Sequence, residues 1–141
     1  MNMKFKDFFD VLEENLADCD EDLLFLHYGP DLFDVLCKIL YEESIDHDTR
    51  LKINAAIAYY VIPLDTISEQ FYGPYGYVDD VFLTVFVLRD VAEEYGYVFL
   101  QRLWDKPEDI KTVMDECYDK SIEFLDDELV ESILKYSGLI E

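Results

Sequence analysis

Basic side chains are scarce in this sequence. Of its 141 residues, 11 are Lys or Arg and 33 are Asp or Glu, which gives a formal net charge of −22. Contacts to nucleic-acid phosphates need Lys and Arg, so direct nucleic-acid binding is disfavoured, and an anionic membrane would repel the chain. The simplest interpretation of the acidic excess is a solvated surface. Other interpretations are a basic protein partner, divalent cations, a high-salt cytoplasm or mimicry of nucleic acid.

Cysteine is also sparse, and no C-x-x-C motif is present. Cys19, Cys37 and Cys117 lie far apart, and the N-terminal residues lack the apolar run of a secretory signal. We therefore expect reduced thiols and a cytoplasmic location. The longest uncharged runs, 53–64 and 70–78, are too short to cross a bilayer, so no membrane span is expected.

Motifs of the common enzyme classes are absent from the sequence. It contains no G-x-S-x-G, no P-loop and no Gly-rich dinucleotide loop. The two histidines, His27 and His47, are isolated, and His47 stands between aspartates at an expected helix start. A zinc hydrolase is therefore disfavoured.

Apolar residues make up 51% of the sequence, which is enough for a chain of this length to bury a core. Their spacing of three and four residues is typical of amphipathic helices, and strand alternation does not extend beyond a few residues. We predict one all-α domain over residues 1–141. Amphipathic helices are expected over about 4–17, 31–43 and 97–104, and after cap sites in 44–48, 105–108 and 126–127.

Two segments, about 53–62 and 79–91, are apolar almost all round, which is the pattern of buried helices. Pro63 ends the first segment, and Asp79 or Asp80 is expected to cap the second. Roughly 16 residues join them, so they can pack antiparallel with Pro63 and Asp79 at the same end. The predicted architecture is a helical bundle with this central buried helical hairpin, wrapped by the amphipathic helices.

Arg89 is the only basic residue between Lys52 and Arg102. It lies four residues before Glu93, so a surface ion pair with Glu93 is the first interpretation. The alternative is that Arg89 is a buried partner for a carboxylate on a covering helix.

The segment 53–91 also carries a family resemblance. Residues 58–67 read Ala-Tyr-Tyr-Val-Ile-Pro-Leu-Asp-Thr-Ile, and residues 76–81 read Gly-Tyr-Val-Asp-Asp-Val. Together they resemble the signature of the YkvA-like family, a small α-helical domain of unknown function. The residues that carry the resemblance are Tyr59, Pro63, Asp65, Ile67, Gly76, Tyr77, Asp79 and Asp80. The resemblance implies a fold and a family, and it implies no reaction.

The sequence departs from the family pattern directly after Ile67. The family has Pro-Asp there, whereas this chain has Ser68-Glu69, which keeps an acid but not the rigid proline. The connection up to Gly76 also looks longer than in the family.

Four acids of this region form the candidate site: Asp65, Glu69, Asp79 and Asp80. In an antiparallel hairpin they would lie near one another, and carboxylate oxygens are the ligands that Mg²⁺ and Ca²⁺ take. The alternatives are that they cap helices or contact a partner.

Two functional hypotheses follow. The first is a non-enzymatic cytoplasmic protein, with no cofactor, that acts through protein–protein contact. The second is a divalent-metal-dependent hydrolase built on Asp65, Asp79 and Asp80. The tyrosines of the connection, Tyr72, Tyr75 and Tyr77, suit either a partner contact or packing over the end of the hairpin.

Overall fold

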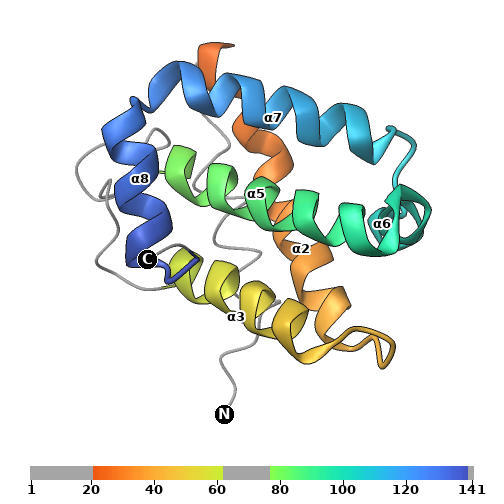
Figure 1. Cartoon of the computed structure of the whole chain (residues 1–141). Helices are drawn as coiled ribbons and strands as arrows, with labels where there is room; N and C mark the ends of the chain where they lie inside the picture. The colour runs from red at the N-terminus through yellow and green to blue at the C-terminus, as the bar shows by residue number, and fades with distance from the viewer. Residues whose placement is uncertain (1–20, 62–76, 140–141) are drawn as a thin grey trace.

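The computed structural model describes residues 21–61 and 77–139, and within these ranges the chain is helical with no strand (Figure 1). The predicted all-α class is therefore confirmed. The helix expected over 4–17 lies outside the described residues. The elements are the 3-10 helix η1 (Glu21–Tyr28) and the α-helices α2 (Gly29–Leu40), α3 (His47–Val61), α5 (Val78–Tyr95), α6 (Tyr97–Trp104), α7 (Ile110–Phe124) and α8 (Asp127–Tyr136).

Helix α5 is the central element. Its first eight residues, from Val78 to Val85, are all buried, and Val87, Leu88 and Val91 continue the buried surface. The helix packs against α2, α3, α6, α7 and α8, and Figure 1 shows it running between α3 and α7. A helix that is apolar on every side needs neighbours on every side, and the rest of the chain supplies them.

Helices α3 and α5 form the predicted hairpin. Thr49 Oγ1, in the first turn of α3, donates to Glu94 Oε2 near the end of α5, at 3.2 Å. One turn further along α3, Lys52 Nζ pairs with Asp90 Oδ2 at 3.3 Å. Later residues of α3 thus contact earlier residues of α5, so the two helices are antiparallel.

Helix α3 differs from the expectation of a helix buried all round. Ile53 and Ile57 are buried, whereas Asn54 is exposed and Ala55 and Ala58 are half-buried. Ala55 and Ala58 are apolar but small, so they expose little apolar surface. This side of α3 therefore does not need a neighbouring helix to cover it. Among the described residues, the first half of α5, Val78–Val85, is buried on all sides.

Two of the predicted helix starts are confirmed. Asp46 caps α3, where its Oδ1 accepts the Thr49 N–H at 2.7 Å, and Asp126 caps α8 by accepting the Leu129 N–H at 2.8 Å. The Thr49 N–H, with the neighbouring Glu94 and Thr49 side chains, lowers the pKa of Asp46 to about 2. Each cap satisfies a backbone donor that the helix itself cannot.

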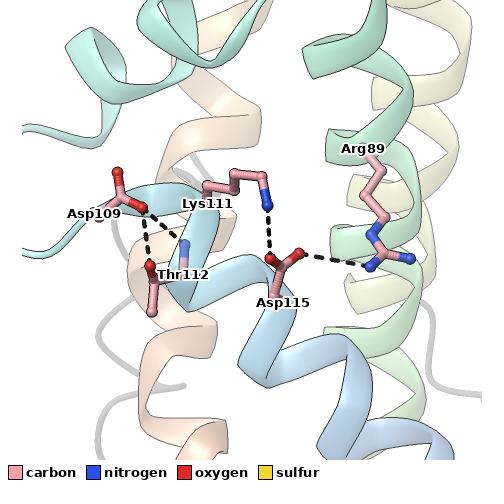
Figure 2. A network of polar contacts seen from close by, with 5 residues as sticks. All are labelled: Arg89, Asp109, Lys111, Thr112 and Asp115. Carbon is pink, nitrogen blue, oxygen red and sulfur yellow. Dashed lines mark hydrogen bonds and ion pairs between the residues drawn. The ribbon is translucent and has the colours of Figure 1, made fainter.

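The capping box expected at Asp105–Glu108 is wrong. Asp105 has a left-handed backbone with φ 51° and ends α6, while Asp109 caps α7 by accepting the N–H and hydroxyl of Thr112 (Figure 2). Gln101 ties the connection together, because its Oε1 accepts the Ile110 N–H at 2.8 Å. This contact across nine residues moves the helix start four positions along the chain.

The described cysteines, Cys37 and Cys117, are free and buried. Burial raises the pKa of both thiols, that of Cys37 to about 12, so both are protonated. Cys19 lies outside the described residues. No helix in the described ranges has the length and apolar character needed to cross a membrane.

Arg89 joins α5 to α7 instead of pairing with Glu93. Its Nη2 lies 3.6 Å from Asp115 Oδ1, and Lys111 Nζ holds the other oxygen of that carboxylate at 3.0 Å (Figure 2). The Arg89 guanidinium also lies 3.7 Å from the centre of the Tyr118 ring. The alternative interpretation is right about the partner, a carboxylate on the covering helix α7. It is wrong about burial, because the Arg89 and Asp115 side chains are 38% and 40% exposed.

We expect Arg89→Ala to lower the free energy of unfolding by about 1 kcal/mol, because it removes both the ion pair and the contact with the Tyr118 ring. Arg89→Lys keeps the charge but loses the planar stacking, so its loss should be intermediate. Urea denaturation measures both. Lys120→Ala, which removes an exposed pair within α7, is the control and should change the value by less than about 0.5 kcal/mol. Equal losses for Arg89→Ala and Lys120→Ala would contradict this account.

Candidate functional site

The two adjacent aspartates stand in the first turn of α5, and both are fully buried. The helix begins at Val78 with Tyr77 as its N-cap residue, so neither Asp79 nor Asp80 occupies the expected cap position. They lie two and three residues after the cap, still within the first turn, where the positive end of the helix favours negative charge.

Asp79 links the two helices of the hairpin. Its Oδ2 accepts the hydroxyl of Tyr59 from α3 at 2.7 Å, in a fully buried contact, and its Oδ1 accepts the Asp80 N–H at 3.1 Å. The Thr84 hydroxyl donates to the Asp80 carbonyl oxygen at 2.9 Å. The Asp80 N–H is one of the donors that a helix start leaves open, so Asp79 performs part of the capping role from inside the helix.

The described signature residues gather at this one place. Tyr59, Tyr77, Asp79 and Asp80 are all buried where α3 ends and α5 begins. The other signature residues lie outside the described residues: Pro63, Asp65, Ile67 and Gly76. Glu69, Tyr72 and Tyr75 also lie outside them.

The metal site therefore stays a prediction. Asp79 and Asp80 are adjacent, but Asp65 and Glu69 are not among the described residues. Within residues 21–61 and 77–139, no group of three or more His, Cys, Asp or Glu side chains is placed to hold a metal ion.

A pocket of about 290 Å³ lies beside the hairpin, between α3 and the end of α8. Its described lining consists of Ala55, Ala58, Tyr59, Tyr136 and Ser137. The Tyr59 hydroxyl donates a hydrogen bond to Asp79, and the Ser137 hydroxyl donates one to the Leu134 carbonyl oxygen. Tyr59 and Tyr136 meet edge to face with ring centres 5.9 Å apart. This described lining carries no carboxylate, imidazole or thiol that could act as a general acid or base.

Two exposed apolar residues went unnoticed in the sequence. Tyr41 is 81% exposed at the end of α2, and Val98 is 86% exposed on α6. The sequence does not indicate that Tyr41 is exposed, because it falls inside a helix expected to continue to 43. It does not single out Val98 either, because Val98 belongs to an apolar stretch. The only available signal was that Val98 lies off the stripe formed by Leu100, Leu103 and Trp104.

We expect Tyr59→Phe to lower the free energy of unfolding by about 2 kcal/mol, because a buried carboxylate loses a charge-assisted hydrogen bond. Tyr136→Phe is the matched control, since it removes a hydroxyl from the half-exposed ring of the same pocket and should cost less than about 0.5 kcal/mol. Urea denaturation of both variants tests this, and an unchanged stability for Tyr59→Phe would contradict it.

Comparison with known proteins identifies the same region. A family model described as "Protein of unknown function (DUF1232)" matches residues 49–86, which run from the first turn of α3 to the middle of α5. A curated relative, "Uncharacterized protein ORF9" of Methanothermobacter thermautotrophicus, is 36% identical over 93 residues, covering 66% of this chain and 64% of that protein. No solved structure matches the chain.

The matched segment is the hairpin that the Tyr59–Asp79 hydrogen bond joins. This agrees with the resemblance to the YkvA-like family, whose signature residues lie in the same segment. Residues 49–86 of this chain are therefore similar to the domain of unknown function DUF1232.

Proposed function

We propose that this chain is a cytoplasmic, non-catalytic domain that acts by binding a basic protein partner. The observation that carries the proposal is that every Lys and Arg side chain in the described residues is already bound to a group of the chain itself, whereas many acids are not. The cytoplasmic part of the proposal rests on the small number of cysteines and on Cys37 and Cys117, which are free thiols in the core.

Each Lys and Arg in the described residues is already engaged. Arg50 donates to the carbonyl oxygens of Leu40 and Glu42, at 2.7 and 3.3 Å. The others form ion pairs: Lys38–Asp34, Lys52–Asp90, Arg89–Asp115, Arg102–Glu42, Lys106–Asp31, Lys111–Asp115, Lys120–Glu123 and Lys135–Glu131.

The acids outnumber these cations and stand exposed on several elements. Glu43, Asp48, Glu93, Asp119 and Glu128 are examples from five different parts of the chain. With a net charge of −22, the surface field attracts cationic partners and speeds their encounter, and it repels acidic proteins. A basic protein is therefore the partner that this surface fits.

To test this, the full chain is immobilised and incubated with cytoplasmic extract of its own organism, fractionated by ion exchange. We expect a partner in the basic fraction, and the Kd of that purified partner should weaken by about tenfold or more between roughly 0.05 and 0.5 M NaCl, because salt screens exposed charges. Surface plasmon resonance gives the Kd. A partner found only in the acidic fraction, a Kd independent of salt, or no partner at all would overturn the proposal.

A second candidate function is a divalent-metal-dependent hydrolase. The observation in its favour is that Asp79 and Asp80 are adjacent and fully buried at the end of the hairpin. Asp65 and Glu69 are the predicted further ligands. Such a set of oxygen donors suits Mg²⁺, Mn²⁺ or Ca²⁺, and a bound cation would offset the burial of two negative charges.

If this second candidate is correct, we expect Mg²⁺, Mn²⁺ or Ca²⁺ at about 100 times its Kd to add about 2.7 kcal/mol to stability, which is a rise of roughly 8 °C in Tm. Because any salt screens so acidic a chain, KCl at equal ionic strength is the reference. Asp79→Asn should abolish the rise, whereas Tyr59→Phe, which keeps the carboxylate, should retain it. A wild-type Tm equal in the divalent salt and in KCl would remove this candidate.

A further inference from the structure

We infer that the proposed basic partner docks at one end of the molecule, on a surface built by α6, the end of α5 and the α2–α3 connection. We call this surface the α6 face and define it by Tyr41, Glu43, Asp46, Tyr95, Val98 and Phe99. The inference rests on the proposed function and adds to it the place of binding and the chemistry of the partner segment.

A chain of contacts holds the three segments of the α6 face together. Arg102 of α6 pairs with Glu42 at 3.1 Å, and its guanidinium lies 5.6 Å from the centre of the Phe99 ring. The Phe99 and Tyr95 rings lie 5.6 Å apart, and the Tyr95 hydroxyl accepts the Asp46 N–H at 2.8 Å. The α6 face is thus formed in advance, and Figure 1 shows α6 and the α2–α3 connection on the same side of the molecule.

The α6 face exposes apolar side chains that nothing in the described residues covers. Val98 is 86% exposed and Tyr41 is 81% exposed, whereas Leu100, Leu103 and Trp104 of α6 turn into the core. Val98 and Arg102 are four residues apart and therefore share one side of the helix. The Arg102–Glu42 pair brings that side to the residue next to Tyr41.

Exposed acidic side chains lie on the same segments as these apolar residues, and Arg50 and Arg102, the cations of these segments, are already engaged. Arg102 is paired with Glu42, and Arg50 is held by the carbonyl oxygens of Leu40 and Glu42. The exposed acids of these segments are Glu43, Asp46, Asp48, Glu93 and Glu94.

Charge complementarity selects the occupant. A partner segment that places an apolar side chain against Tyr41 and Val98, flanked by Lys or Arg, satisfies both the apolar residues and the acids on the same segments. A second copy of this chain would bring another net charge of −22 to the contact, and an anionic membrane would be repelled in the same way. The occupant is therefore a basic amphipathic segment of another protein.

The test uses the full chain and a fluorescent amphipathic peptide of Leu and Lys as the probe, followed by anisotropy at low salt. Two control peptides replace Lys by Glu or Leu by Ser. We expect Tyr41→Ser combined with Val98→Ser to weaken probe binding by about tenfold, because truncating the central apolar contacts of an interface has effects of this size. Ile122→Ser on α7, at another exposed apolar residue, should leave it within about twofold.

Glu43→Lys tests the charge. It changes the net charge by the same amount as Asp119→Lys on α7, so it should weaken binding several-fold more than that control if the α6 face is the site. All substituted side chains are exposed, and an unchanged Tm confirms that each variant is folded.

The outcomes separate this inference from the proposed function. Binding that needs both Leu and Lys in the peptide, and that falls with the α6-face variants alone, supports the inference. Binding that the α7 variants weaken as much, or that the Ser-containing peptide retains in full, overturns the α6 face but leaves a basic partner in place. If no basic probe binds at low salt, the proposed function fails and the inference fails with it.

Discussion

A buried carboxylate at the start of α5 constrains the arrangement of the whole chain. Asp79 is fully buried, and a charge in the interior is tolerated only when polar groups compensate for the lost water. The Tyr59 hydroxyl, the Asp80 N–H and the positive end of α5 meet that need. Because Tyr59 lies near the end of α3, this bond fixes which ends of the two helices meet. The matched residues 49–86 include this pair, so the similarity to DUF1232 covers the two residues that join the hairpin in this chain.

The enclosure of α5 explains where the charges lie. The covering helices bury their apolar sides on α5, and their outer sides carry the acids. Several of the cations join separate elements: Lys52 links α3 to α5, Arg89 links α5 to α7, and Lys106 links the α6–α7 connection to α2. Cations that join two elements are held close to the protein surface. Many of the acids have no such cation beside them and point outward into solvent. The acidic surface is therefore partly a consequence of how the helices are fastened.

Local signals in the sequence predicted the fold well, and contacts between distant residues account for the differences. The bounds of α6, the end of α5 at Tyr95 and the cap at Asp126 follow from neighbouring residues. Asp105 has the spacing of a capping box, but Gln101 binds the backbone on either side of Asp109 and shifts the helix start. For the candidate site, the resemblance identified Tyr59 and Asp79, but a bond between residues 20 positions apart depends on the packing of two helices.

Acidity alone would make this chain a weak and unselective binder, since exposed charges are screened by salt and contribute little to affinity. They raise the rate of encounter and exclude like-charged proteins, whereas affinity comes from apolar side chains buried at the centre of a contact. On the described surface, Tyr41 and Val98 are the most exposed large apolar residues, and the segments that form the α6 face also carry exposed acids. A basic segment without an apolar side chain would meet only the charges, and an apolar segment without cations would leave the acids desolvated. The combination is therefore what gives such a surface selectivity.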